Sequence, residues 1–182
     1  KKAVHDGHSI IATGEMGIGN TTTSTAILSL LTGLSPKELT GVGANFPVEK
    51  LDHKANVISD AIYSKDISVE DPIALLAAVG GLDIAGLTGV MLGGAIYGVP
   101  VVVDGYISTI AALLACRLNP LIKSYLIPSH ASHEKSAALA TELLGLEPYL
   151  HLNMRLGEGS GAVLAFDLAS AASTILNDMI TF

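Results

Sequence analysis

The segment Gly14 to Thr22 is rich in glycine and follows an apolar run, an arrangement typical of loops that bind phosphate. Gly14, Gly19 and Thr21 have the spacing of a P-loop, but Asn20 stands where the P-loop has its lysine. Without that lysine, backbone N–H groups at a helix start can still hold a single phosphate. The segment therefore predicts either a monophosphate site or a plain glycine-rich turn between strand and helix, and the loop alone favours neither.

A second unusual loop, Gly157-Glu158-Gly159-Ser160-Gly161, places one carboxylate between glycines. The glycines allow close approach of a ligand to the backbone. A carboxylate shielded from water there could act as a general base. The residues by themselves favour a simpler interpretation, in which Glu158 stands at a helix start and interacts with the helix dipole.

Other polar residues precede or lie within predicted helices. His130 and His133 are three residues apart, but no third metal ligand is evident, so we expect no metal site and interpret both as polar loop residues or helix caps. Ser132 resembles an N-cap and could also donate to a ligand. Lys54 is either a solvated helix lysine, the commoner case, or a replacement for the missing loop lysine that reaches the phosphate.

Helical and strand-like segments alternate along the chain. Continuous apolar runs predict buried strands, and helical spacing with glycine or proline at the ends predicts helices. The predicted strands cover residues 8–13, 101–103, 125–128 and 149–154. The predicted helices cover residues 22–31, 48–65, 72–79, 83 onward, 106–118, 134–144 and 162–178, with a loop over 41–47.

This alternation predicts an α/β fold, a three-layer Rossmann-like parallel sheet with helices on both faces, as a single nucleotide-binding and catalytic core over residues 1–182. In such sheets ligands bind beyond the carboxyl ends of the strands. The two glycine loops, Asp104-Gly105 and Ser129 to His133 all follow predicted strands. We therefore expect them to meet at one edge of the sheet.

Composition argues against several classes of protein. The net charge is −7, and no basic stripe suggests a nucleic-acid surface. The single cysteine, Cys116, excludes an internal disulfide and lies in an apolar run, which favours a buried structural thiol. Residues 84–103 carry no charge and reach the length of a membrane span, but Pro100 and several glycines favour a helix followed by a buried strand. We expect a cytoplasmic protein that does not bind membranes.

Four segments together resemble one family, the nicotinate-nucleotide–dimethylbenzimidazole phosphoribosyltransferases of cobalamin lower-ligand assembly. They occur in family order over nearly the whole chain: Gly14 to Thr22, Val103 to Tyr106, Ser129 to Glu134 and Arg155 to Ala162. Family members are longer and have an N-terminal part and a small domain. The resemblance therefore implies that this chain is the large-domain portion of a longer protein. The segment from Gly41 to Lys50 differs from the family's usual sequence.

The resemblance implies transfer of phosphoribosyl from nicotinate mononucleotide to 5,6-dimethylbenzimidazole or a similar base, giving α-ribazole 5′-phosphate and nicotinate without a cofactor, in a homodimer. It implies that Glu158 is the general base and Glu15 a second carboxylate near the ribose or the reacting base. The residues that it implies for the phosphate and ribose pocket are Gly17, Ile18, Gly19, Asn20, Thr21, Lys54, Asp104, Gly105, Ser132, Leu156 and Gly157.

Two other functions fit the residues. A non-catalytic nucleotide-binding paralogue or fragment would bind nucleotide without releasing nicotinate. A P-loop NTPase would hydrolyse ATP, although Asn20 in place of lysine argues against this function.

Overall fold

A small parallel sheet organises the computed structural model, which describes residues 1–43 and 46–180. The strands β1 (Ile11–Ala12), β2 (Val101–Val103) and β3 (Leu126–Pro128) lie in the order β1-β2-β3. Ile11 pairs with Val101, and Val101 pairs with Leu126. The predicted parallel sheet is confirmed, although β1 is shorter than the predicted strand over residues 8–13.

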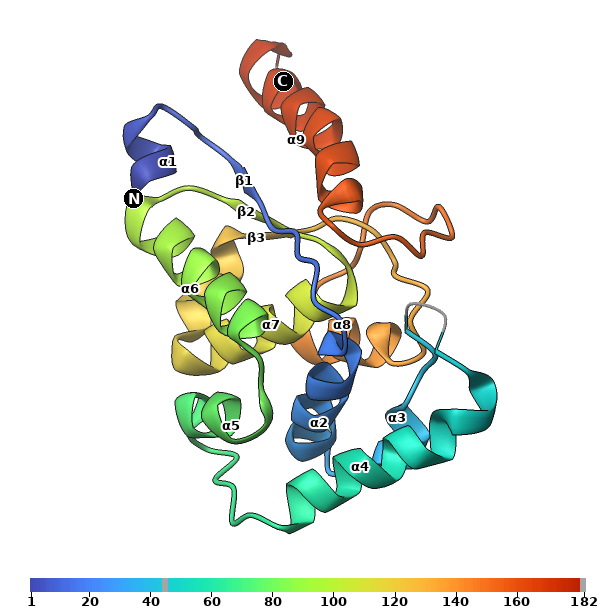
Figure 1. The fold of residues 1–182 in the computed structure, drawn as a ribbon. Helices are drawn as coiled ribbons and strands as arrows, with labels where there is room; N and C mark the ends of the chain where they lie inside the picture. Colours follow the sequence, from blue (N-terminus) through green and yellow to red (C-terminus); the bar gives the residue numbers. More distant parts are fainter. Residues whose placement is uncertain (44–45, 181–182) are drawn as a thin grey trace.

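The side chains of β2 alternate between two apolar clusters. Val101 and Val103 pack into the main core with α6 (Leu82–Tyr97) and α7 (Gly105–Leu118), whereas Val102 packs against Ala162 and Ala165 of α9 (Ser160–Asp178). Helices therefore cover both faces of the sheet, as Figure 1 shows. This arrangement confirms the predicted layers.

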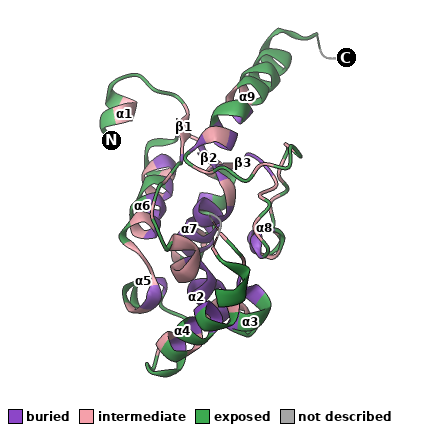
Figure 2. Ribbon diagram, turned by 45° about the vertical axis from the view of Figure 1, so that its right-hand side comes forward, coloured by how far each residue is buried: buried purple, intermediate pink, exposed green. Residues whose placement is uncertain are grey.

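The helix α7 forms the centre of the main core. Most of its residues are buried (Figure 2), and it packs between α6 and α8 (Ala137–Leu144). The remaining elements are α1 (Lys2–His5), α2 (Asn20–Thr32), α3 (Pro36–Leu39), η1 (Val48–Lys50), α4 (Leu51–Tyr63), α5 (Pro72–Val79) and η2 (Pro120–Tyr125).

Local signals in the sequence end several helices where they were expected. Gly33 ends α2 and Gly145 ends α8, both with a left-handed backbone that glycine adopts easily. Pro72 begins α5, where the Asp71 carboxylate accepts the N–H groups of Ile73 and Ala74. These helices form because of their own sequences as well as their packing.

Three local predictions are wrong or fall outside the described residues. Residues 149–154 form no strand among the described elements, since they make one bridge, between Leu150 and His130, and a separate backbone hydrogen bond from the His133 N–H to the Met154 carbonyl oxygen. The helix predicted from Glu134 begins at Ala137, so Ser132 is not its N-cap. Ala44 and Asn45 of the predicted 41–47 loop lie outside the described residues.

The uncharged stretch over residues 84–103 is divided between α6 and β2, with a left-handed turn at Gly98 between them. Among the described residues, no helix is both long enough and apolar enough to cross a membrane. Cys116 is half-buried against the core, and burial raises the pKa of its thiol, which favours a structural role over a nucleophilic one.

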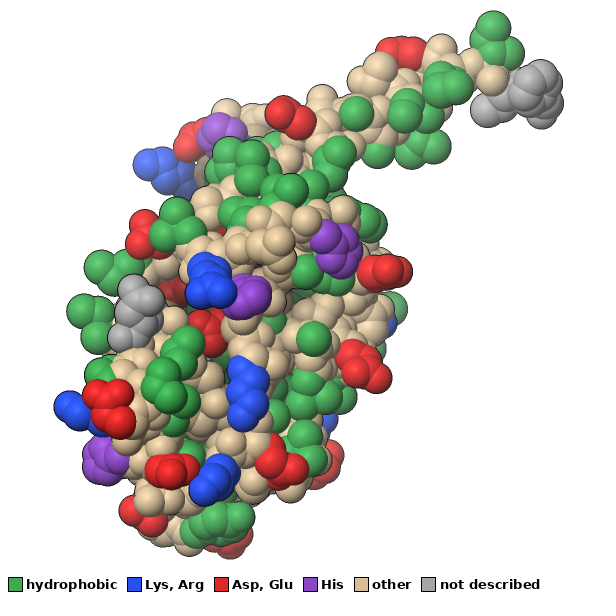
Figure 3. Space-filling model, turned by 90° about the vertical axis from the view of Figure 1, so that its right-hand side faces the viewer, with side chains coloured by type: hydrophobic (Ala, Val, Ile, Leu, Met, Phe, Trp, Pro, Cys, Tyr) green, Lys and Arg blue, Asp and Glu red, His purple; other side chains and the backbone are tan. Residues whose placement is uncertain are grey.

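The helix α9 projects beyond the body of the molecule (Figure 3). Its N-terminal turns pack on the sheet through Ala162 and Ala165. Farther along, large apolar side chains such as Ile175 and Leu176 are exposed.

Two neighbouring glycines in α6 provide a test of this packing. A Cβ at Gly94 would collide with the Val101 side chain and lie 2.8 Å from the Val99 carbonyl oxygen. Gly94→Ala should therefore lower the free energy of unfolding by about 1–3 kcal/mol. At Gly93 a Cβ would have no described atom within 4 Å outside the local helix backbone. Gly93→Ala should stabilise by up to about 1 kcal/mol. Equal effects in urea unfolding would contradict the packing of α6 on β2.

Candidate functional site

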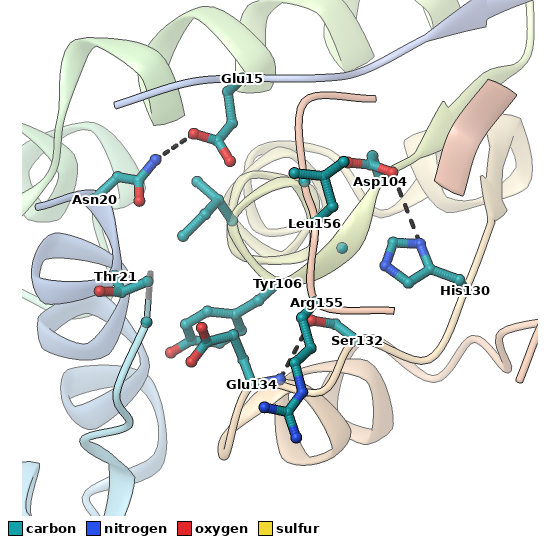
Figure 4. Close-up of a pocket in the computed structure, with 14 residues that line it drawn as sticks. Glu15, Asn20, Thr21, Asp104, Tyr106, His130, Ser132, Glu134, Arg155 and Leu156 are labelled. Carbon is teal, nitrogen blue, oxygen red and sulfur yellow. Dashed lines mark hydrogen bonds and ion pairs between the residues drawn. The ribbon is translucent and has the colours of Figure 1, made fainter. Parts of the chain in front are cut away.

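A pocket lies at the carboxyl edge of the sheet, where the chain leaves all three strands. Its lining comes from the loop after β1, the turn from β2 into α7, the segment after β3 and the loop before α9 (Figure 4). The lining residues are Glu15, Asn20, Thr21, Gly43, Asp104, Gly105, Tyr106, Ile107, His130, Ser132, Glu134, Arg155, Leu156 and Gly157. The predicted convergence of these loops is confirmed.

Most of the predicted site residues line this pocket, and some do not. The predicted residues that line it are Glu15, Asn20, Thr21, Asp104, Gly105, Ser132, Leu156 and Gly157. The predicted residues outside the lining are Gly17, Ile18, Gly19, Lys54 and Glu158. The structure gives the position of each residue and not its ligand, so the role of each stays a prediction.

The first glycine loop leads directly into α2. Gly19 has φ +91° and precedes the first helical residue, Asn20, whose N–H donates to the Gly17 carbonyl oxygen at 3.1 Å. Ile18 is fully exposed, so its side chain is not part of the pocket wall. The loop therefore aims a helix N-terminus at the pocket, and this geometry suits both a phosphate site and a simple turn.

Lys54 reaches from α4 to the start of α2. Its side chain is buried, and Nζ donates to Thr21 Oγ1 at 2.8 Å and to the Gly41 carbonyl oxygen at 3.2 Å. Nζ also lies 5.4 Å from the centre of the Phe46 ring. Burial lowers the pKa of Lys54, although the Glu134 carboxylate opposes that shift. The solvated-lysine interpretation is therefore wrong, since Lys54 lies directly behind Thr21.

Glu15 is the carboxyl group of the pocket with the most altered acidity. Burial is the main cause that raises its pKa to about 7, and the charges of Asp83, Asp104 and Glu158 raise it further. The Asn20 side-chain amide donates to the Glu15 carboxylate and opposes the shift. Glu15 is therefore able both to donate and to accept a proton near neutral pH.

Glu158 lies at the edge of the site with an exposed side chain. The condition of shielding from water, which the general-base alternative set for this carboxylate, is not met by the described residues, because they leave the side chain exposed. Its backbone has φ +63°, a left-handed conformation that is rare outside glycine. The helix α9 begins at Ser160, so Glu158 precedes the first turn instead of lying in it.

Several lining residues were not predicted as part of a ligand site. Tyr106 and Glu134 each end one of the four segments that carry the family resemblance, but only the fold shows that they line the pocket. Burial raises the pKa of the Tyr106 hydroxyl. His130 is buried beside Asp104, with Nδ1 3.7 Å from Oδ1. The signal that could have found His130 is its place two residues after the buried strand β3.

The remaining polar residues of the 129–134 segment form local pairs. Ser132 Oγ accepts from the Glu134 N–H at 3.4 Å, and His133 Nε2 lies 3.0 Å from Arg155 Nη2. No group of three or more His, Cys, Asp or Glu side chains is arranged for a metal ion within the described part of the chain.

Comparisons with known proteins connect this geometry to a family. A family model described as Phosphoribosyltransferase matches residues 1–182. The chain belongs to this phosphoribosyltransferase family. Two similar relatives are named nicotinate-nucleotide–dimethylbenzimidazole phosphoribosyltransferase. The protein from Escherichia coli (strain 536 / UPEC) is 49% identical over 98% of this chain. The protein from Alkaliphilus metalliredigens is 53% identical over the same share.

Solved structures from this phosphoribosyltransferase family agree with the fold. A crystal structure of CobT from Thermus thermophilus matches the whole chain with a TM-score of 0.92 and 38% identity. A crystal structure of the same organism's nicotinate-nucleotide–dimethylbenzimidazole phosphoribosyltransferase matches with a TM-score of 0.89. The chain spans about half the length of these relatives. It covers 50% of the Escherichia coli protein and 51% of the Alkaliphilus metalliredigens protein. It covers 54% and 53% of the two crystallised chains, in the order given above.

The raised pKa of Glu15 predicts a pH dependence of stability. A carboxyl whose pKa rises from 4.5 to about 7 on folding stabilises the fold fully below pH 4.5, and this contribution is lost as the pH rises through 7. Glu15→Gln removes the titration. The quantity to compare is the free energy of unfolding of Glu15→Gln minus that of the unaltered protein. This difference should be more positive at pH 8 than at pH 4.5. Urea unfolding across this range measures the difference.

Glu49→Gln on the exposed helix η1 is the matched control for this prediction. Parallel pH profiles for Glu15→Gln and the unaltered protein would contradict the assignment to Glu15.

Proposed function

We propose that the protein containing this chain transfers the phosphoribosyl group of nicotinate mononucleotide to 5,6-dimethylbenzimidazole or a similar base, in cobalamin lower-ligand assembly. The products are α-ribazole 5′-phosphate and nicotinate. Family membership and the names of the relatives support this reaction. The observation that carries the proposal is a pocket lined by the N-terminus of α2 and by Glu15, whose pKa is raised to about 7, with the buried Lys54 donating to Thr21 behind that lining.

The phosphate of nicotinate mononucleotide fits the α2 side of this pocket. The N-terminus of α2 offers backbone N–H groups and the positive end of the helix dipole. Thr21 and Ser132 add hydroxyl groups in the lining, and the Lys54 cation lies directly behind Thr21. In the proposal, this end binds and orients the substrate.

The sugar carbon then lies toward the acidic side of the pocket, beside Glu15. The bond between the sugar carbon and the nicotinate ring nitrogen breaks, and its electron pair leaves with the ring, which loses its positive charge. The azole nitrogen forms the new bond with inversion. Positive charge that develops on the sugar is stabilised by the nearby carboxylates. The reaction needs no cofactor.

Glu158 takes the azole proton in this proposal, and Glu15 is the second carboxyl near the reacting atoms. The loop of Glu158 touches the first glycine loop, because a Cβ at Gly14 would lie 2.7 Å from the Gly159 nitrogen. Glu158 also contributes to the raised pKa of Glu15, so the two carboxylates interact electrostatically. The proposal includes a homodimer, a cytoplasmic location and a base-binding region supplied by the rest of the longer protein.

The second candidate is a nucleotide-binding protein without catalysis. The observation that favours it is the exposed position of Glu158 outside the pocket lining. It predicts binding of nicotinate mononucleotide by the full-length protein without nicotinate release. The NTPase alternative is less well supported, because Asn20, in the place of the P-loop lysine, donates its amide to Glu15.

The role of Glu158 can be tested with Glu158→Ala in the full-length protein. If Glu158 is the general base, kcat should fall by about 10²–10⁴-fold, the usual contribution of such a group. Chromatography of ribazole phosphate and nicotinate measures the rate. Full turnover by Glu158→Ala would remove Glu158 from the mechanism.

The role of Lys54 can be tested with Lys54→Met. Loss of a charge-assisted contact of about 1.5–3 kcal/mol should weaken binding of nicotinate mononucleotide by about 10–150-fold. Lys50→Met on η1, where the lysine is exposed, is the control and should bind normally. Isothermal titration calorimetry gives both dissociation constants, and equal values would contradict a role for Lys54 at the phosphate.

A further inference from the structure

Asp104 holds the start of α9 from a distant part of the chain. Its Oδ2 accepts the Gly159 N–H at 3.0 Å, and its Oδ1 accepts the Ala162 N–H at 3.0 Å. Asp104 directly follows β2 and is only 4% exposed. The first N–H groups of a helix have no partner within the helix, and Gly159 has no side chain to supply one. The Asp104 carboxylate therefore serves as the N-terminal cap of α9.

His130 lies beside this carboxylate (Figure 4). Its ring is buried, with Nδ1 3.1 Å from Ser129 Oγ and 3.7 Å from Asp104 Oδ1. Ser129 donates its single hydroxyl proton to the Val103 carbonyl oxygen at 2.7 Å. Ser129 Oγ must therefore accept from His130, which places a proton on Nδ1, the nitrogen that faces Asp104.

The first turn of α9 rests directly on the His130 ring. A Cβ at Gly161 would overlap the ring, with Cγ only 2.8 Å away, so only glycine fits between helix and imidazole. On the opposite side, Gly14 leaves room for the backbone of Gly159. The turn that carries Glu158 is thus fixed by close contacts on two sides.

Glu158 needs this support because its own backbone is strained. Its φ of +63° and the φ of +85° at Gly159 place two consecutive residues in the left-handed region. A residue with a Cβ keeps such a conformation only where its surroundings impose it. The peptide that joins Glu158 to Gly159 ends in the N–H that Asp104 accepts.

We infer that Asp104, with His130 packed beside it, is a positioning residue that holds the backbone of Glu158 at the edge of the pocket by anchoring the start of α9. The inference rests on the proposed function, in which Glu158 takes the azole proton. The resemblance implies only that Asp104 lines the ribose pocket, and the positioning role is additional to that place in the lining. Both Asp104 oxygens accept backbone N–H groups, so its main role is to hold the loop.

The test compares Asp104→Asn with the unaltered full-length protein. The asparagine amide keeps one acceptor but presents N–H groups where the other acceptor stood. We expect kcat to fall about 100-fold, since displacement of a reacting group by about 1 Å has this effect. The KM for nicotinate mononucleotide should change by less than about threefold, because an interaction expressed only in the transition state lowers kcat alone.

A double variant distinguishes positioning from an independent role. If Asp104 acts through Glu158, Asp104→Asn combined with Glu158→Ala should be no slower than Glu158→Ala alone. Asp71→Asn is the matched control, because Asp71 also accepts two backbone N–H groups at a helix start, in α5. It should leave kcat unchanged. The inference would be overturned in favour of a direct substrate contact by either of two results. One is a double variant whose loss of kcat is the product of the two single losses, and the other is an Asp104→Asn variant with a raised KM and a normal kcat.

His130 offers a second route if Asp104→Asn does not fold. His130→Asn can place an amide N–H near the position of Nδ1, whereas His130→Ala cannot. The asparagine variant should therefore retain more of kcat than the alanine variant, and equal losses would contradict the support of Asp104 by His130.

Hydrogen exchange separates this inference from the proposed function. In Asp104→Asn, the peptide that contains the Gly159 and Ala162 amides should exchange faster, with no such change in Asp71→Asn. If the unaltered protein makes no ribazole phosphate, the proposed function and the reaction-positioning role both fail, but faster exchange would still support the anchoring of α9. Unchanged exchange would overturn the anchoring itself.

Discussion

The parallel pairing of β2 with a strand on each side is the constraint on which the site depends. The Thr13 N–H donates to the Val102 carbonyl oxygen and the Ser129 N–H donates to the Val103 carbonyl oxygen, so both flanking chains run past β2 in register. The loops that follow the three strands must then leave the sheet at one edge. Glu15, Asp104 and Ser132 lie in one pocket for this reason, although they are far apart in sequence.

The site brings charges of both signs close together. Lys54 lies behind Thr21 at the start of α2, and the charges of Asp83, Asp104 and Glu158 act on the Glu15 carboxyl, which the Asn20 side chain of α2 contacts directly. Partial burial strengthens both effects, because it weakens screening by water. Such a pocket suits a substrate with an anionic phosphate and a sugar carbon that becomes positive, which is the chemistry of the proposed reaction.

Local sequence determined much of the fold. Pro72, Gly33 and Gly145 mark helix boundaries through backbone conformations that depend only on their own residue types. The continuous apolar run Val101–Val103 predicted a strand buried on both faces, as it is. The order of the glycine loops and strand ends also sufficed to predict their meeting at one edge. These features follow from short-range preferences and from the geometry common to all parallel sheets.

The tertiary structure decided those features that depend on contacts between segments far apart in the sequence. Residues 149–154 have the composition of a strand, but among the described residues they pair with no neighbouring strand beyond one bridge to His130. Lys54 looked like a surface lysine, and only the packing of α4 against α2 buries it behind Thr21. The cap of α9 by Asp104 joins residues 55 apart. Burial and hydrogen bonding depend on which atoms surround a group, and a linear pattern of residue types does not contain that information.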